Sequence, residues 1–285
     1  MRRIVNLEIH VAHSCNLTCE SCAHYSNHGH KGVIELATAE RWMAPWAGRL
    51  LPAQFSLVGG EPTIHPDLAG FVRLARRFWP ETPIRLVTNG FFLDRHPDLP
   101  AAMRAAAPAW IDLSIHHASP EYRARIAPIL DFARKWKERH GLDIRFNEAF
   151  RQWTRRYHGF GTAMKPFTDG DPRRSWEICP ARICPQILDG RIYKCALLAY
   201  LPMQHARYGL GAEWAPSLAY RPLEPGCSDE ALEEFFAREE EPVCGMCPAE
   251  RRELALPDPH PAARAPARAG TAPDDPALRI PRPAA

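Results

Sequence analysis

Three cysteines lie close together near the start of the chain. Cys15, Cys19 and Cys22 follow the first apolar segment of a 285-residue sequence, within a single loop. Three thiolates can hold three corners of an iron–sulfur cube and leave the fourth iron without a protein ligand, open for chemistry. Thiolates two residues apart also bind zinc, with His24 or His28 as a further ligand. Both metal centres are compatible with this spacing.

A second set of cysteines follows in the C-terminal half. A hairpin is expected over 186–197, turning on Asp189-Gly190 and ending at a cysteine, and a Cys-x2-Cys pair comes later. These thiols can surround one metal centre, either an iron–sulfur cluster or a structural zinc ribbon. The members are Cys179 or Cys184, then Cys195, Cys244 and Cys247, with Cys179 favoured over Cys184 on spacing. Cys227 has no partner at ligand spacing and is expected to be a loop thiol.

The elements that must position these residues alternate between strand and helix. Apolar runs predict strands over 4–10, 55–58, 84–88, 111–115 and 144–146, and apolar spacing near 3.6 predicts helices over 38–50, 68–78, 99–106 and 120–139. A short helix is expected over 229–238. Repeated strand–helix units form parallel sheets, whose reactive groups lie at the C-terminal ends of the strands.

The predicted strand ends carry small and polar residues. The second strand runs into Gly59-Gly60-Glu61-Pro62, the third ends in Thr88-Asn89-Gly90, and Ser114 closes the fourth. Glycines let a backbone approach a ligand closely, although such segments also form ordinary turns.

The order of these motifs resembles the radical S-adenosylmethionine (SAM) superfamily, whose loop reads Cys-x3-Cys-x2-Cys. The resemblance implies an α/β fold with a partial (β/α)6 TIM-like barrel and a [4Fe–4S] cluster on Cys15, Cys19 and Cys22. The open iron would bind SAM, and one electron would cleave it to methionine and a 5′-deoxyadenosyl radical that abstracts hydrogen from substrate. The implied SAM-binding residues are Gly59, Gly60, Glu61, Pro62, Thr88, Asn89 and Ser114.

Two positions depart from that family's pattern. His116-His117 stand where relatives commonly have an Asp, and Ser21 stands where many have an aromatic residue that meets the adenine. Adenine recognition is therefore expected to fall more on the backbone.

The C-terminal half resembles the auxiliary-cluster module called twitch, a short relative of the SPASM domain. The resemblance implies a second [4Fe–4S] cluster, with no open iron, that takes an electron from the substrate radical or holds the substrate. Its implied ligands are Cys179, Cys195, Cys244 and Cys247.

Composition sets the wider limits. The expected organisation is a barrel core over 1–160, the auxiliary module over 161–255 and a disordered Ala/Pro/Arg-rich tail over 256–285. The 36 Lys and Arg against 33 Asp and Glu give a net charge of +3, which does not indicate a nucleic-acid partner. A membrane span or signal peptide is not predicted, and nine cysteines favour metal chemistry in the cytoplasm over disulfides.

The predicted function is hydrogen abstraction from a small polar, sugar-like metabolite, with electrons from a reducing partner such as flavodoxin or ferredoxin. A cluster of arginines between the two halves suits an anionic substrate or is a solvated face: Arg151, Arg155, Arg156, Arg173 and Arg174. His24, Tyr25 and His28 either face the site or pack the loop. Two alternatives stay open, namely a maturase of ribosomally made peptides with a separate leader-binding partner, and a non-enzymatic zinc-binding module.

Overall fold

A computed structural model describes residues 1–252. Its main sheet has seven strands in the order β7-β6-β5-β4-β2-β8-β9. All neighbours pair in parallel except β8 and β9, which form an antiparallel hairpin. The strands are β2 (Leu7–His10), β4 (Phe55–Val58), β5 (Ile84–Thr88), β6 (Ala109–Ser114), β7 (Asp143–Asn147), β8 (Gln186–Leu188) and β9 (Arg191–Tyr193).

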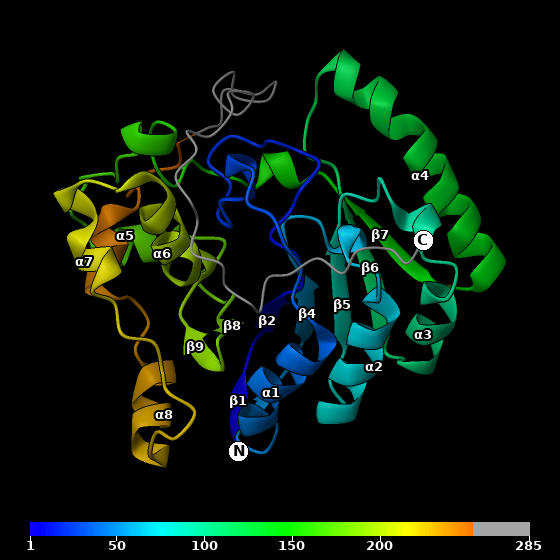
Figure 1. Ribbon diagram of the computed structural model, residues 1–285, viewed down its shortest axis with the longest axis horizontal. Helices are drawn as coiled ribbons and strands as arrows, with labels where there is room; N and C mark the ends of the chain where they lie inside the picture. The colour runs from blue at the N-terminus through cyan, green and yellow to red at the C-terminus, as the bar shows by residue number, and fades with distance from the viewer. Residues whose placement is uncertain (253–285) are drawn as a thin grey trace.

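Four helices connect the five strands from β2 to β7, as the alternating pattern predicted. They are α1 (Leu36–Ala47), α2 (Leu68–Phe78), α3 (Leu99–Ala105) and α4 (Pro120–His140). Capping side chains fix two of their starts, because Asp67 accepts from the Gly70 N–H and Ser119 from the Tyr122 N–H. Figure 1 shows these helices along the outer side of the strands, as in a partial barrel.

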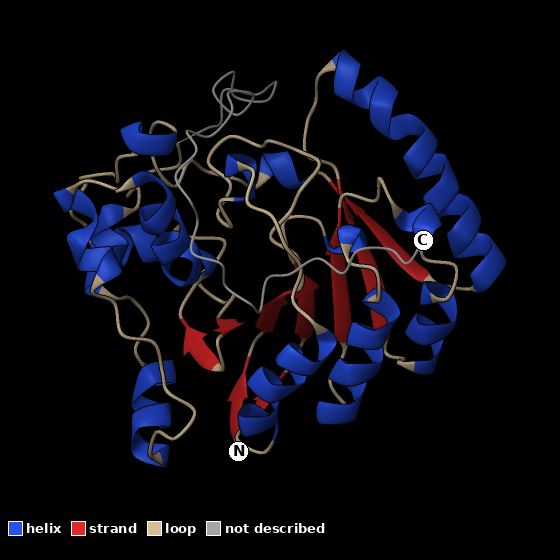
Figure 2. Cartoon of the chain, viewed as in Figure 1, coloured by secondary structure: helices blue, strands red, loops and turns tan. Residues whose placement is uncertain are grey.

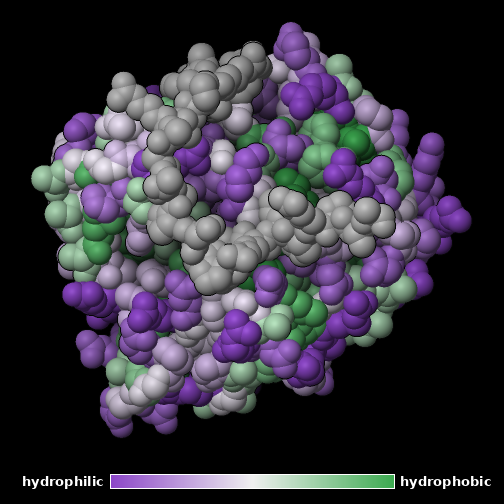
Figure 3. Space-filling view, in the orientation of Figure 1, coloured by the Kyte–Doolittle hydropathy of each residue, from purple (hydrophilic) through white to green (hydrophobic). Residues whose placement is uncertain are grey.

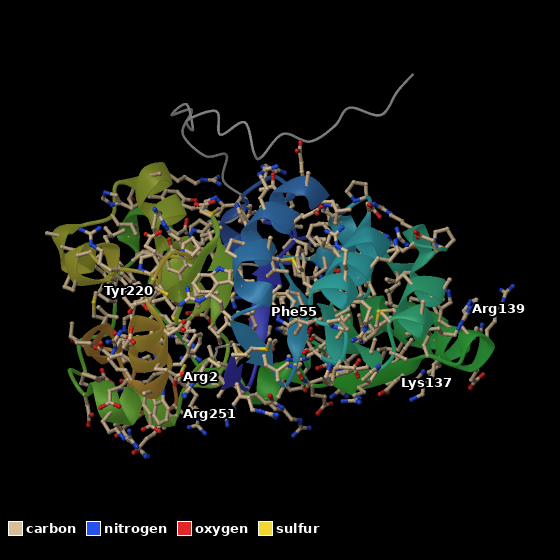
Figure 4. The ribbon with its side chains drawn as sticks, turned by 90° about the horizontal axis from the view of Figure 1, so that it is seen from below. Arg2, Phe55, Lys137, Arg139, Tyr220 and Arg251 are labelled. Atoms are coloured by element: carbon tan, nitrogen blue, oxygen red, sulfur yellow. The ribbon has the colours of Figure 1, made fainter. Side chains whose placement is uncertain are left out.

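The buried centre of the barrel is aromatic and aliphatic. Phe55 on β4 stacks on Trp79 with ring centroids 4.6 Å apart, and both are buried. Figure 4 shows Phe55 in the middle of the molecule. Trp46 is fully buried, and its indole N–H donates to the Gly190 carbonyl at 2.7 Å. That hydrogen bond joins α1 to the turn of the β8–β9 hairpin.

The second half of the chain is mainly helical apart from this hairpin. Its helices are α5 (Pro172–Glu177), α6 (Ala196–Tyr208), α7 (Ala215–Leu218) and α8 (Asp229–Ala237). Figure 2 shows α5, α6 and α7 gathered beyond the β8–β9 edge of the sheet. Short 3-10 helices complete the described chain: η1 (Ser26–His28), η2 (Pro62–Ile64), η3 (Leu93–Arg95), η4 (Ala149–Arg151), η5 (Gly161–Ala163), η6 (Ala212–Trp214) and η7 (Pro242–Met246).

The hairpin turns where expected but ends earlier. Asp189 and Gly190 have φ of 52° and 74°, the left-handed conformation of a tight two-residue turn. The predicted extension to residue 197 is wrong, because α6 begins at Ala196. This helix was not predicted from the sequence. It contains Pro202, and an internal proline normally argues against a helix. Local pattern also missed the small parallel pair of β1 (Arg2–Ile4) and β3 (Leu50–Pro52), which leaves β2 shorter than the predicted strand.

The expected α/β class with a partial TIM-like barrel is confirmed. Because β8 pairs with β2, both halves share one sheet, and the boundary at residue 160 stays a prediction. The predicted tail over 256–285 lies outside the described residues. Figure 3 shows hydrophilic residues over most of the visible face, as the balanced charge would suggest.

Within residues 1–252, no helix combines the length and apolar character needed to cross a membrane.

Candidate functional site

The first three cysteines lie on the loop that follows β2, here called the first cysteine loop (residues 11–25). Backbone hydrogen bonds fix its start beside the end of β4, because the Gly60 N–H donates to the Ala12 carbonyl at 2.7 Å and the Glu61 N–H to the Ser14 carbonyl at 2.9 Å. A Cβ on Gly60 would lie 2.5 Å from the Ser14 oxygen. This glycine is therefore required for close packing of the loop.

Glu61 is buried and joins three parts of the site. Its carboxylate accepts hydrogen bonds from the Thr63 N–H and hydroxyl, the Thr88 hydroxyl and the Asn89 N–H. Burial raises the pKa of Glu61, while the hydrogen bonds from Thr63 and Thr88 oppose that rise. The carboxylate thus holds the end of β5 against η2, which begins at Pro62.

We expect Glu61→Ala to lower the free energy of unfolding by about 3 kcal/mol, because several buried donors lose their acceptor. Glu61→Gln should cost less, since its amide oxygen keeps part of the network. The exposed Glu40, paired with Arg77 on the surface, is the control, and Glu40→Ala should cost under about 0.5 kcal/mol. Urea unfolding measures all three, and equal costs for Glu61→Ala and Glu40→Ala would contradict the assigned role.

The other predicted SAM-binding residues lie at neighbouring strand ends. Asn89 donates its side-chain N–H to Asn16 Oδ1 at 2.8 Å, and its Nδ2 lies 4.0 Å from Cys15 Sγ. Ser114 is buried at the end of β6, opposite Asn147 on β7. Gly59, Gly60, Glu61 and Pro62 follow β4, so the set lies at the carboxyl ends of β4, β5 and β6, and Gly60, Glu61 and Asn89 contact the first cysteine loop.

Each thiol of the first cysteine loop has a different environment. Cys15 Sγ accepts from the Leu17 N–H at 3.4 Å, and Cys19 Sγ lies 3.6 Å from His116 Nδ1. Burial raises the pKa of both thiols, and each has a neighbouring cysteine that raises it further. Burial would also raise the pKa of Cys22, but the hydrogen bond and charge of His24 lower it.

This donor set fits an iron–sulfur cluster. The three half-buried thiols lie on one loop, and the charges of Cys19 and Cys22 raise the pKa of Cys15. A metal–sulfur centre would supply the positive charge that such closely spaced thiolates need. Among the described residues no three His, Cys, Asp or Glu side chains are placed to hold a single metal ion. Thiolates on separate corners of a cube bind different irons and do not have to meet at one ion.

His116 is a neighbour of the loop that local sequence pattern did not reveal. It follows β6, 97 residues after Cys19, and its ring also packs on Trp153 at 4.9 Å. Burial lowers the pKa of His116 to about 4, so the imidazole is neutral at pH 7. Only its place in a family pattern, where it replaced an expected Asp, pointed to it.

The C-terminal cysteines come together from three elements. Cys179 follows α5, Cys195 lies between β9 and α6, and Cys244 and Cys247 lie in and just after η7. The Ser175 hydroxyl donates to the Cys247 carbonyl at 2.9 Å, which joins α5 to η7. Burial raises the pKa of Cys195, and so do three neighbouring thiols, Cys179, Cys247 and Cys244. We call these four residues the second cysteine group.

Two cysteines lie apart from the second cysteine group. Cys184 Sγ accepts from the Asn6 side chain at 3.6 Å and lies beside Glu8 of β2, which adds to the effect of burial in raising the pKa of Cys184. Cys227 Sγ accepts from Arg49 at 3.3 Å, near the start of α8. This placement favours Cys179 over Cys184 as the partner of Cys195.

Ser21 connects the first cysteine loop to the segment that precedes the second half. Its hydroxyl oxygen accepts from the Arg156 N–H at 2.7 Å and the Tyr157 N–H at 3.2 Å, and Ser21 has the left-handed φ of 54°. The Tyr157 hydroxyl donates to the Cys22 carbonyl at 3.4 Å. Many relatives in the family carry an aromatic residue at this position. Here Ser21 makes structural hydrogen bonds instead.

Three aromatic or imidazole residues of the loop region pack inward. Tyr25 and His28 are buried against Tyr157, with ring centroids 5.4 and 6.0 Å away, and His24 stacks on His10 at 4.9 Å. Of the two interpretations offered by the sequence, packing of the loop accounts for these contacts.

Four of the five arginines expected to gather between the halves pair with nearby carboxylates. Arg155 pairs with Glu20 at 3.1 Å, Arg151 with Glu148, and Arg174 with Glu177. Arg173 on α5 pairs with Glu177, Glu239 and Glu240 at the surface. Arg156 alone among the five is buried.

A polar cavity of about 580 Å³ lies against the chain segment that follows η4. Its lining includes Arg155, His158, Asp169, Arg251 and Arg252. Arg155 and His158 also line a small adjoining cavity of about 60 Å³ that reaches Glu20 and Ser21. Figure 4 shows Arg251 on the side of the molecule that carries the second half.

Comparison with known proteins identifies the class of the barrel. Residues 9–139 match the model of the Radical SAM superfamily. A GTP 3′,8-cyclase from Paenarthrobacter nicotinovorans is 28% identical over 135 residues, which are 46% of this chain and 37% of the cyclase. Thus the chain spans little more than a third of that relative.

Solved structures are more distant. BtrN in complex with AdoMet and 2-DOIA is 14% identical, with a TM-score of 0.49 over 89% of this chain and 98% of BtrN. Streptococcus suis SuiB bound to precursor peptide SuiA is 16% identical, with a TM-score of 0.42 over 50% of this chain and 32% of SuiB. Neither likeness is close enough to assign a substrate.

The matched segment includes the cysteines on the loop that follows the first strand of the barrel. Residues 9–139 form a radical SAM superfamily domain, and the resemblance of the first motifs is confirmed at that level.

Proposed function

We propose that this protein is a radical SAM enzyme that abstracts hydrogen from a small polar substrate. Cys15, Cys19 and Cys22 would hold the SAM-binding [4Fe–4S] cluster. The observation that carries this proposal is the placement of all three thiols on one loop within the radical SAM domain, next to the ends of β4 and β5. When bound, the cluster and SAM supply the 5′-deoxyadenosyl radical.

The residues around the loop suit the binding of SAM. Gly59 and Gly60 bring the chain after β4 close to the cysteine loop, and Asn89 lies beside Cys15. Glu61 and Thr88 hydrogen bond to each other and thereby hold these strand ends in place. Pro62 and Ser114 complete the proposed set at the ends of β4 and β6.

The second cysteine group is proposed to hold an auxiliary [4Fe–4S] cluster in a twitch-like module. Its support is the mutual proximity of Cys179, Cys195, Cys244 and Cys247, with Cys184 placed elsewhere. Four thiolates leave no iron open, so these residues would position a redox centre that does not bind SAM.

The polar cavity supports a small, polar and acidic substrate. Arg251 and Arg252 line it with Arg155, and guanidinium groups suit carboxylate or phosphate. The small cavity of about 60 Å³ shares Arg155 and His158 with it and reaches Glu20 and Ser21 of the first cysteine loop, so a substrate in the polar cavity would lie near that loop. A reducing protein such as flavodoxin or ferredoxin is the proposed electron donor.

Iron content tests both proposed centres. Anaerobically reconstituted protein should contain about eight irons per chain and little zinc, because each cube holds four irons. The triple variant Cys15→Ala/Cys19→Ala/Cys22→Ala should keep about four irons, because the second cysteine group is intact. Metal analysis and absorption spectra measure this. Loss of all iron from the triple variant would refute the second cluster, and zinc as the main metal would favour the zinc-binding module.

A further inference from the structure

Arg156 is a buried arginine next to the second cysteine group. The residue is 6% exposed and lies on the segment between β7 and α5. Its guanidinium Nη1 donates to Cys179 Sγ at 3.4 Å. A guanidinium is effectively always protonated, so the buried side chain carries a positive charge.

This position does not suit contact with substrate. Arg155, the preceding residue, lines both described cavities and pairs with Glu20, whereas Arg156 lines neither of them. A buried charge is costly unless it has a partner of opposite charge. Cys179 Sγ is the side-chain partner that the structure gives to this guanidinium.

The chemistry of a cluster with four thiolate ligands explains the pairing. Such a cluster is negatively charged, and reduction adds one more negative charge. Net charge and hydrogen bonds to the sulfurs are two factors that set the reduction potential of an iron–sulfur cluster. A buried guanidinium that donates to a ligand sulfur acts through both, and it stabilises the reduced state more than the oxidised state.

We propose that Arg156 is the counter-charge of a cluster held by the second cysteine group and that it raises the reduction potential of that cluster. The inference rests on the proposed second cluster. It makes Arg156 a positioning and tuning residue that contacts the ligand Cys179.

The backbone of Arg156 has a separate role that allows a clean test. Its N–H donates to Ser21 in the first cysteine loop, and this contact survives any non-proline substitution of the side chain. Arg156→Gln removes the charge and keeps a hydrogen-bond donor, and Arg156→Lys keeps the charge. Arg155→Gln is the matched control, because it removes an adjacent charge that faces Glu20.

The experiment measures midpoint potentials in the triple variant Cys15→Ala/Cys19→Ala/Cys22→Ala, which isolates the second cluster. Dithionite titration followed by electron paramagnetic resonance gives the potential without any enzymatic turnover. We expect Arg156→Gln to shift the potential to lower values, Arg156→Lys to restore most of the shift, and Arg155→Gln to leave it near that of the parent.

The outcomes separate this inference from the proposed function. A triple variant without iron would refute the second cluster and, with it, the role of Arg156. If the cluster is present but Arg156→Gln leaves its potential unchanged, or shifts it no more than Arg155→Gln does, the inference is wrong. If Arg156→Gln loses the cluster and Arg156→Lys keeps it, the counter-charge is supported. Loss in both variants would show a packing role instead.

Discussion

Replacing any one of Cys15, Cys19 or Cys22 by alanine should abolish the reductive cleavage of SAM. Each substitution removes one of three thiolates from a cube that already has one open iron, so the cluster loses its anchoring on the loop. We expect 5′-deoxyadenosine formation to fall by at least about 1,000-fold, which corresponds to about 4 kcal/mol in the barrier. The assay is chromatography of 5′-deoxyadenosine after incubation with dithionite and SAM under anaerobic conditions.

The chain provides matched controls for these variants. Cys184 and Cys227 contact Asn6 and Arg49, away from the first cysteine loop. Cys184→Ala and Cys227→Ala should therefore keep SAM cleavage within about threefold of the parent, or under about 1 kcal/mol. Wild-type-like cleavage by any of the three loop variants would overturn the assignment of the cluster to this loop.

Replacing a residue of the second cysteine group should separate SAM cleavage from product formation. Cys195→Ala or Cys247→Ala leaves the proposed auxiliary cluster short of a ligand while the first cysteine loop keeps its three thiols. We expect measurable, uncoupled formation of 5′-deoxyadenosine and a loss of substrate conversion of at least about 100-fold, about 3 kcal/mol. 5′-Deoxyadenosine and the product of the substrate are quantified in the same reaction, once the substrate has been identified.

Two controls make this second result interpretable. Circular dichroism checks that the variants fold, because Cys195 directly precedes α6 and packs against the hydrophobic core around that helix. Cys184→Ala tests the ligand assignment and should keep product formation. Folded Cys195→Ala protein with full product formation would remove any catalytic role for the second cluster. Folded protein that binds the first cluster but releases no 5′-deoxyadenosine would show that the two centres do not act separately.

The sequence alone determined the parallel strand–helix order and the motifs at the strand ends. Strands such as β4 and β5 and helices such as α2 and α4 appear within a few residues of their predicted bounds. Side-chain periodicity is a local property, and a strand or amphipathic helix must present its apolar residues at fixed intervals to be buried. The cysteine loop and the Gly59-Gly60 segment are likewise short and continuous, so their order could be recognised directly.

Tertiary structure decided which of the remaining residues meet. Arg156 was one of five arginines predicted to gather between the two halves, and only the folded chain shows that it alone of the five is buried, against Cys179. Cys184 and Cys179 look alike in the sequence, yet strand pairing of β8 with β2 takes Cys184 to Asn6 and Glu8. His116 reaches Cys19 across 97 residues. Such contacts depend on how distant elements pack against one another, and no local periodicity or spacing records that packing.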